Sequence, residues 1–427
     1  MKKREVRILL LSIISAVLLM TGLYYAKDRI FPSLSAEGVE TAAPSPSVSP
    51  EDPVSASAEP RPTASPVPAA SPSGPGSESA PDKKVPQTSA PAASTPKPKS
   101  TSKPETAAPK QIAPHEPIDL IFAGDALMDW SVKETIKKKG PDYPFQYVKQ
   151  EVSKADYAFV NLETSVTNAS EKDTNQLYNF KSDPVSLRGL KNAGFDLVSI
   201  ANNHVLDFGR QGFLDTLDNL KQAGLPYVGG GRNSEEAYKA KTVKINGATV
   251  KYLAFSRFIP TPDWFAGPDK PGIAQAYDKS AVLPVIKREQ KDCDYLFVYM
   301  HWGVEKNHKP EEWQRTFAKE MIDAGADGII GSHVHVLQGF EYYKGKLIAY
   351  SIGNFLFPDY VKDAKADTGL LKLKLKNGLI TADFNPYYIQ KDQIIKRDAA
   401  YDQKQLSFLQ SISYGVRLRG TAIEPAK

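Results

Sequence analysis

Five short apolar runs between residues 118 and 335 each end in side chains that can bind a metal ion or transfer a proton. In chain order, these side chains are Asp125, then Glu163, then Asn202, Asn203, His204 and Asp207, then His301 and Glu305, then His333 and His335. Four of the six histidines of the chain belong to this set. Carboxylate, amide and imidazole ligands together suit Mn, Fe or Zn better than Ca. The pattern therefore predicts a site for one or two divalent metal ions.

Each of these residues also has a purely structural interpretation. Gly124-Asp125 could form a turn or a helix cap, and Asn202-Asn203 could cap the helix expected near Gly209. If a strand continued through His333-Val334-His335, one ring would face inward and the other outward, which leaves a single ligand. The structural interpretation would have to hold at all five strand ends at once, so we favour the metal site.

The elements that must position these residues are short strands and amphipathic helices that alternate from residue 118 onward. Expected strands cover residues 118–123, 157–161, 197–201, 250–255, 295–300, 328–330 and 346–351. Expected helices cover residues 184–193, 210–223 and 310–324. This order predicts a layered α/β domain over residues 118–395 with at least partly parallel strands, followed by a polar tail over 396–427. In such sheets, ligand sites form at the carboxyl ends of the strands.

Taken together, the motifs resemble the CapA family, which is linked to poly-γ-glutamate capsule synthesis. The motifs that carry the resemblance are Gly124-Asp125, Asn161-Leu162-Glu163, Asn202-Asn203-His204 with Asp207, His301-Trp302-Gly303 with Glu305, Gly331-Ser332-His333 with His335 and Gln338, and Gly353-Asn354-Phe355. The resemblance spans about residues 118–357. It implies a fold related to the calcineurin-like metallophosphatases, an α-β-β-α sandwich.

The resemblance also implies a role for individual side chains. The metal ligands that it implies are Asp125, Glu163 as the bridging acid, Asn203, His301, His333 and His335. His204 would act near the leaving group and Asp207 would orient it, while we expect Asn202 and Glu305 to support the ligands from behind. Metallophosphatases usually carry a histidine two residues after the first aspartate, and this chain has Leu127 there. The first metal would therefore have one protein ligand fewer.

The first 117 residues are expected to hold an anchor and a tether. A basic stub over residues 1–7 precedes an uncharged apolar run over 8–26, which as a helix of about 28 Å nearly spans a bilayer. The basic stub should stay in the cytoplasm, so we predict a single-pass protein of the cell membrane with its C-terminal domain on the cell-wall side. A cleaved signal peptide is the alternative, but the run is long and lacks a small-x-small cleavage site.

Residues 27–117 form a tether rich in Pro, Ser, Ala and Thr. The part from Pro32 to Pro117 contains no Phe, Trp or Tyr, so it cannot bury enough apolar surface to fold and is predicted to be disordered. His115 is expected to be an exposed residue of this tether.

Composition excludes several classes of protein. The single cysteine, Cys293, excludes disulfides and thiolate-rich metal sites, and we expect it to be a buried bystander. The net charge of +5 is small for 427 residues, so nucleic acid is not an expected partner.

Two functions stay open. The first is a metal-dependent hydrolase that cleaves a phosphoester or an amide-type bond. The second, implied by the resemblance, is an accessory protein that works with the membrane components of polyglutamate synthesis and export and binds the acidic polymer. We favour poly-γ-glutamate capsule biosynthesis and export with a metal-binding, hydrolase-like site. The alternative is a phosphoesterase or amide hydrolase that acts on another extracellular polymer.

Overall fold

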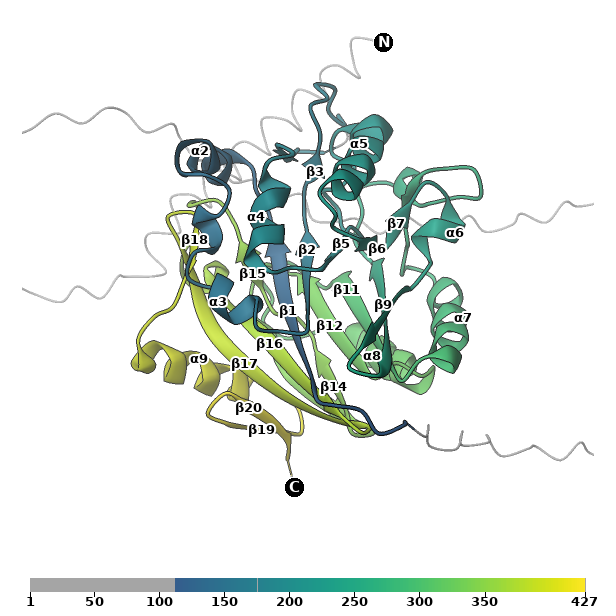
Figure 1. Cartoon of the computed structure of the whole chain (residues 1–427), viewed down its shortest axis with the longest axis vertical. Helices are drawn as coiled ribbons and strands as arrows, with labels where there is room; N and C mark the ends of the chain where they lie inside the picture. Colours follow the sequence, from purple (N-terminus) through teal and green to yellow (C-terminus); the bar gives the residue numbers. More distant parts are fainter. Residues whose placement is uncertain (1–111, 175, 427) are drawn as a thin grey trace, which may run out of the picture. The chain divides into compact units, whose positions relative to one another are not determined.

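In the computed structural model, which describes residues 112–174 and 176–426, two β-sheets lie between helices (Figure 1). The expected anchor over 8–26 and all of the expected tether before residue 112 lie outside these residues. Within the described part of the chain, no helix is both long enough and apolar enough to cross a membrane.

The larger sheet has ten strands and a parallel centre. Its main order is β19-β20-β17-β16-β1-β2-β5-β6, with β15 beside β1 and β18 beside β17. The strands β15, β1, β2, β5 and β6 pair in parallel, whereas β16 to β20 pair antiparallel. The bounds are β1 Ile118–Ala126, β2 Tyr157–Leu162, β5 Leu197–Ser199, β6 Tyr227–Val228, β15 Asn354–Leu356, β16 Asp367–Lys376, β17 Leu379–Gln390, β18 Gln393–Ile395, β19 Val416–Arg419 and β20 Ala422–Pro425.

The second sheet has six strands in the order β13-β14-β12-β11-β9-β8. Its four central strands are parallel, and each edge is closed by an antiparallel strand. The bounds are β8 Lys241–Ile245, β9 Ala248–Ser256, β11 Tyr295–Trp302, β12 Gly328–His333, β13 Phe340–Tyr343 and β14 Lys346–Ala349. Two small two-stranded sheets complete the strands: β3 Ser165–Val166 with β4 Lys181–Ser182, and β7 Gly230–Gly231 with β10 Gly272–Ile273.

The two large sheets share an aromatic core. Side chains alternate along β1, so Phe122 enters this core while Ile121 packs among the helices on the other face. The Phe122 ring lies 5.7 Å from Phe159 and 5.6 Å from Phe297 of the facing sheet. The Tyr299 hydroxyl donates to the Ala123 carbonyl at 3.0 Å, which ties β11 directly to β1.

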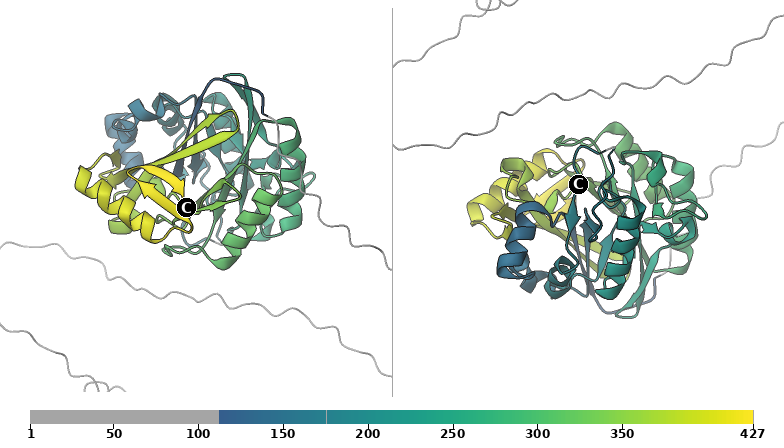
Figure 2. Two further views of the ribbon diagram at one scale, coloured as in Figure 1. Left: turned by 90° about the horizontal axis from the view of Figure 1, so that it is seen from below. Right: turned by 90° about the horizontal axis from the view of Figure 1, so that it is seen from above.

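Helices cover the outer face of each large sheet, which gives the expected layers. The helices α2 to α5 pack on the ten-stranded sheet, and α7 and α8 pack on the six-stranded sheet. Figure 2 shows the C-terminal elements in yellow on one side of the domain. The bounds are α2 Trp130–Lys139, α3 Lys149–Val152, α4 Ser186–Ala193, α5 Gly209–Gln222, α6 Ser234–Ala237, α7 Lys279–Glu289, α8 Glu312–Asp323 and α9 Ala399–Ser411. Single 3₁₀ turns cover Tyr143–Phe145, Pro262–Trp264, Gln290–Asp292 and Asp363–Lys365.

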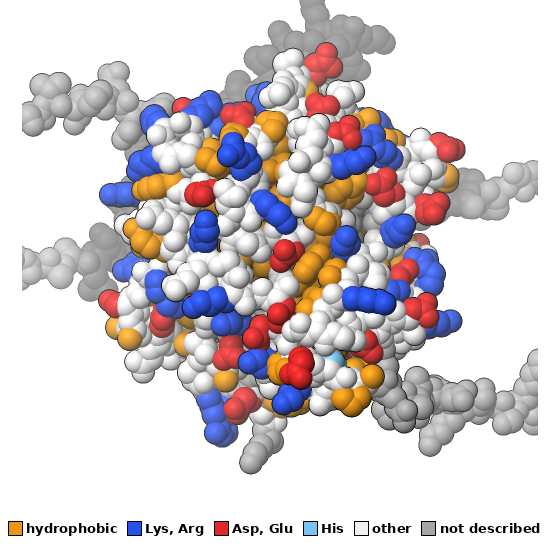
Figure 3. Space-filling view, in the orientation of Figure 1, with side chains coloured by type: hydrophobic (Ala, Val, Ile, Leu, Met, Phe, Trp, Pro, Cys, Tyr) orange, Lys and Arg blue, Asp and Glu red, His pale blue; other side chains and the backbone are white. Residues whose placement is uncertain are grey.

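Charge is mixed on the surface. On the face in Figure 3, Lys and Arg side chains are scattered among acidic ones rather than gathered into one basic patch. This mixed pattern is what a small net charge of +5 leads one to expect. Cys293 is buried, as expected.

Residues 396–427, expected as a polar tail, carry α9, β19 and β20. The strand β20 pairs with β17, and Leu409 and Ile423 are buried in the core between the sheets. Most other residues of α9 are polar or exposed, so the apolar pattern of this segment is weak and the sequence gives little sign of its packing.

The described chain also begins before the expected domain boundary at residue 118. Ile112 packs against the core between the sheets, and His115 Nε2 lies 2.8 Å from the Tyr295 hydroxyl. His115 is therefore packed against the domain, and the prediction that it is exposed was wrong. Its partner Tyr295 is distant in sequence, so no local pattern indicates this contact.

Replacing Leu409 with Ala is expected to lower the free energy of unfolding by about 2–5 kcal/mol, because it removes a fully buried side chain from the core between the sheets. Urea denaturation followed by tryptophan fluorescence measures the change. Leu379→Ala is the control, since that side chain is 65% exposed. A Leu409→Ala effect as small as the control would show that α9 does not contribute to the core.

Candidate metal centre

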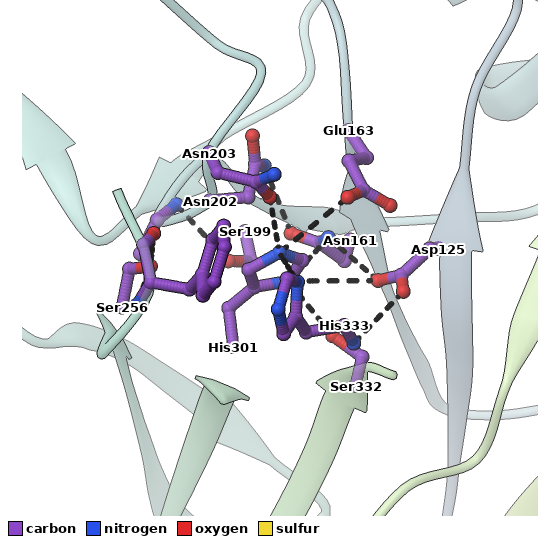
Figure 4. A network of polar contacts seen from close by, with 12 residues as sticks. Asp125, Asn161, Glu163, Ser199, Asn202, Asn203, Ser256, His301, Ser332 and His333 are labelled. Carbon is purple, nitrogen blue, oxygen red and sulfur yellow. Dashed lines mark hydrogen bonds and ion pairs between the residues drawn. The ribbon is translucent and has the colours of Figure 1, made fainter. Parts of the chain in front are cut away.

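The predicted metal ligands meet where strands of both large sheets end. Asp125 is the next-to-last residue of β1 and pairs in register with Asn161 of β2, while Glu163 directly follows β2. In the six-stranded sheet, His301 of β11 lies beside Ser332 of β12. Figure 4 shows these side chains pointing toward one another from the two sheets.

Two groups of possible ligands share one carboxylate. Asp125, Glu163 and His335 each offer a ligand atom, and these atoms all lie within 4.8 Å of one another. Glu163, His301 and His333 form a second group under the same limit. The family resemblance implies a bridging role for Glu163, and Glu163 is the residue that both groups share.

Asn203 completes the set of six expected ligands. Its Oδ1 lies 2.7 Å from His301 Nε2, which is also 3.1 Å from His333 Nδ1 and 3.4 Å from Glu163 Oε1. Three ligand-type atoms therefore converge on one imidazole nitrogen. A single proton on His301 Nε2 cannot form hydrogen bonds with all three of these atoms, whereas a cation placed among them could bind them together.

Several buried polar atoms at this site have no hydrogen-bond partner among the described residues. They include both carboxylate oxygens of Glu163 and the Nε2 atom of His333. A buried carboxylate without a partner carries a full desolvation penalty, so native structures seldom keep one. A bound divalent cation would remove the penalty, and the donor set therefore fits Mn, Fe or Zn.

Burial also sets the charge of the ligands. It raises the pKa of Asp125 to about 6, with repulsion from Glu163 adding to the shift, and it raises the pKa of Glu163 itself. Burial lowers the pKa of His301 to about 3 and that of His333 well below its ordinary value. Both imidazoles are therefore neutral near pH 7, which is the form that binds a metal.

A layer of amides and one hydroxyl holds the ligands in place. Asn161 Nδ2 donates to Asp125 Oδ1 at 2.7 Å, and Asn202 Nδ2 donates to Asn161 Oδ1 at 3.1 Å. Ser332 Oγ lies 3.2 Å from His301 Nδ1, and Asn354 Oδ1 lies 2.8 Å from His335 Nδ1. Asn202 thus acts behind the ligands as expected.

Sequence reasoning named no role for Asn161, Ser332 or Asn354. All three belong to the motifs singled out in the sequence, so their signal was present. Their hydrogen-bond partners depend on the pairing of β2 and β15 with β1 and of β12 with β11, which the sequence alone does not show.

Two of the histidines adopt unusual backbone angles. His333 has φ +97° and His335 has φ +59°, a region that non-glycine residues rarely occupy. The His333 N–H donates to Asp125 Oδ2 at 2.9 Å and so fixes the turn at the end of β12. Because the chain leaves the extended conformation at His333, strand alternation does not separate the rings, and each histidine reaches one ligand group.

His204 and Asp207 form a buried pair beside the ligands. His204 Nδ1 lies 2.8 Å from Asp207 Oδ2, and this oxygen also accepts the Phe180 N–H at 2.7 Å. Burial lowers the pKa of His204, but the charge and hydrogen bond of Asp207 and the charges of Glu163 and Glu305 together outweigh it, so the net pKa is raised. The alternative in which Asn202-Asn203 cap a helix is not observed, because the residue before α5 is Phe208.

A pocket of about 330 Å³ opens onto this pair. His204, His335, Asn354 and Glu305 are among its lining residues. Glu305 was expected behind His301, but it is exposed and lines the pocket instead, while Ser332 and Asn161 face His301 Nδ1. The difference arises because β11 ends at Trp302, so the chain has turned outward before Glu305.

Leu127 provides no metal ligand. It is fully buried in a small apolar cluster with Phe180, Phe357 and Val361. The first ligand group therefore consists of Asp125, Glu163 and His335 without a contribution from residue 127.

Comparisons with known proteins point to one family. A family model described as "Bacterial capsule synthesis protein PGA_cap" matches residues 119–359, a range that contains all six expected metal ligands. The chain is 33% identical over 303 residues to "Capsule biosynthesis protein CapA" of Bacillus anthracis, covering 68% of this chain and 72% of that protein. It is 35% identical over 273 residues to "PGA biosynthesis protein CapA" of Bacillus subtilis strain 168, covering 63% and 71%.

Among solved structures, the chain is similar to the calcineurin-like phosphoesterase YfkN from Bacillus subtilis. The two are 15% identical, with a TM-score of 0.39, and the match covers 70% of this chain and 99% of that one.

Single substitutions should separate the two ligand groups. We expect His333→Ala to lower metal content at one group only, His335→Ala at the other, and Glu163→Gln at both, because Glu163 is shared. Elemental analysis and calorimetric Mn titration of the purified protein measure this. His308→Ala is the control, since its Nδ1 lies 2.8 Å from the Leu337 carbonyl and it belongs to neither group. Unchanged metal content in Glu163→Gln would contradict the shared site.

Removing the unpaired charge should stabilise the metal-free protein. We expect Glu163→Gln to raise the free energy of unfolding in chelator by about 1–3 kcal/mol, because the buried carboxylate lacks a partner. Glu341→Gln should have the opposite sign, since Arg315 and Lys319 pair with the Glu341 carboxylate. Denaturant unfolding with and without metal measures both changes, and destabilisation by Glu163→Gln in chelator would contradict the electrostatic argument.

Proposed function

Because the chain belongs to the PGA_cap family of bacterial capsule synthesis proteins, we propose that it takes part in the biosynthesis of a poly-γ-glutamate capsule through a metal-dependent site. The observation that carries the proposal is the pair of ligand groups joined by Glu163, which lies within the residues that match the family model. The proposed metal ligands remain Asp125, Glu163, Asn203, His301, His333 and His335.

The residues of the site are suited to a hydrolytic step. Divalent cations bound there would polarise a phosphoester or amide bond and lower the pKa of a water molecule. Glu163 would keep two such charges close together, and Asn203 adds an oxygen without further negative charge. The neutral rings of His301 and His333 are ready to bind without first losing a proton.

His204 is the proposed proton donor. Asp207 holds its Nδ1 and keeps a proton on the ring, which leaves Nε2 for the leaving group of a substrate in the pocket. A metal site with a purely structural role has no need of such a pair. This observation supports a second candidate function, a phosphoesterase or amide hydrolase that acts on another extracellular polymer.

The sequence of the first 111 residues fits a role at the membrane. We propose that residues 8–26 anchor the protein in a single pass and that residues 27–111 carry the domain toward the cell wall. There it would work with the membrane components that synthesise and export the polymer.

In a strain that lacks its own protein of this family, the wild-type chain is expected to restore polymer at the cell surface, and Glu163→Gln is expected not to. His204→Ala should keep its metal but hydrolyse γ-glutamyl or phosphoester substrates about 10²–10⁴-fold more slowly, because it removes the proton donor alone. Polymer immunoassay, substrate screening and elemental analysis give the three measurements.

His115→Ala serves as the control, because His115 bonds Tyr295 at the start of β11 and takes no part in the ligand groups. Full restoration of polymer by Glu163→Gln would reject the metal-dependent role. Hydrolysis at the wild-type rate in His204→Ala would reject His204 as the proton donor, whereas a wild-type protein that hydrolyses none of the substrates would leave an accessory role.

A further inference from the structure

The pocket beside the metal centre has an aromatic rim, formed by Trp130, Tyr178, Phe180 and Tyr360. Trp130, Tyr178 and Tyr360 are 45%, 55% and 49% exposed. The Trp130 ring lies 5.2 Å from Tyr360, 5.4 Å from Phe180 and 6.3 Å from Tyr178. Large rings that cluster in water without cover are uncommon unless they contact a partner or ligand.

The protein holds Trp130 in a costly conformation. Its φ is +49°, a left-handed value that bulky residues avoid, and it is the first residue of α2. The preceding residue, Asp129, accepts the Lys181 N–H at 2.7 Å and so fixes the start of α2 to β4. Strain of this kind persists where surrounding contacts enforce it, and it clusters at ligand sites.

The rim leads directly to the metal centre. The Phe180 ring lies 4.6 Å from the ring of His204, and the Phe357 ring lies 5.1 Å from His335. Leu127 packs beneath with Phe180 and Phe357. The residue that replaces an expected metal ligand therefore supports the rim from below.

The pocket also carries charged side chains next to the rings, the basic Lys306 and Lys365 and the acidic Glu305. Lys365 lines it, and no ion pair joins Lys365 to another residue of the described chain. Asn354 donates to the Lys365 carbonyl at 2.9 Å, and its Oδ1 lies 2.8 Å from His335 Nδ1. The backbone of Lys365 is thus tied to a residue that orients a metal ligand.

We propose that the aromatic rim and Lys365 form a binding subsite for an anionic, amide-linked chain. The rings would pack on its methylene groups and amide faces, and Lys365 would pair with its carboxylates. This inference rests on the proposed function. Aromatic rings also stack on sugars, but the cationic side chain beside a site for divalent cations favours a ligand with repeated negative charge.

The test is the binding of a fluorescent γ-linked glutamate oligomer to the full-length, Mn-loaded protein, followed by anisotropy. We expect Trp130→Ala and Tyr360→Ala each to raise the Kd about tenfold, because a buried aromatic contact is lost. Lys365→Gln should raise the Kd about threefold at low salt and weaken its salt dependence. Metal content should stay unchanged in all three variants, since none is a ligand.

Matched controls are Tyr147→Ala and Lys149→Gln, an exposed ring and an exposed cation that do not line this pocket. Trp130→Phe should keep near wild-type affinity because it retains a ring. If Trp130→Ala does not fold, Tyr360→Ala carries the test, because its side chain is half exposed.

The outcomes separate this subsite from the function on which it rests. If the wild type binds the oligomer and the rim variants bind it equally well, the subsite is wrong and the proposed function stands. If the wild type binds a neutral oligosaccharide and no glutamate oligomer, both are rejected. Equal loss for γ-linked and α-linked oligomers supports a subsite that recognises charge and amide faces rather than the linkage.

Discussion

A carboxylate buried without a hydrogen-bond partner is the constraint on which this site depends. Glu163 is fully buried, neither of its carboxylate oxygens has a hydrogen-bond partner among the described residues, and the desolvation of its charge raises its pKa despite the neighbouring histidines. The neutral rings around it add ligand atoms but no positive charge, because burial suppresses their protonation. A divalent cation would balance the charge of such a cluster, and the raised pKa of Glu163 shows what its absence costs the carboxylate.

The rigidity of the two sheets makes this arrangement possible. Parallel central strands bring the ends of β1 and β2 and the ends of β11 and β12 to one place, and the aromatic core between them fixes their separation. The hydrogen bond from Tyr299 to the Ala123 carbonyl joins the sheets two residues before Asp125. Ligands on strand ends are therefore positioned by the core, and the amide layer sets only their final orientation.

Residue types and their positions after apolar runs were enough to predict strands that end in possible metal ligands, whereas the six individual ligand roles were implied by the family resemblance. These features depend on local patterns. Contacts between distant segments were not predictable, such as Asn354 with His335 or Leu409 with the sheet core. Glu305 was wrongly predicted to lie behind His301, because the sequence does not show at which residue β11 ends and the chain turns away from the site. The aromatic rim was not predicted either, because Trp130 and Tyr360 lie more than 200 residues apart in the sequence.

The side chain of Asn354 contacts two groups at once. Its Oδ1 lies beside Nδ1 of His335, and its Nδ2 donates to the carbonyl of Lys365. If a ligand of the proposed subsite displaced the 358–365 segment, the change would reach His335 through this amide. Thermodynamic reciprocity then requires that a cation at the candidate metal centre alter the affinity for this ligand by the same factor by which the ligand alters the affinity for the cation.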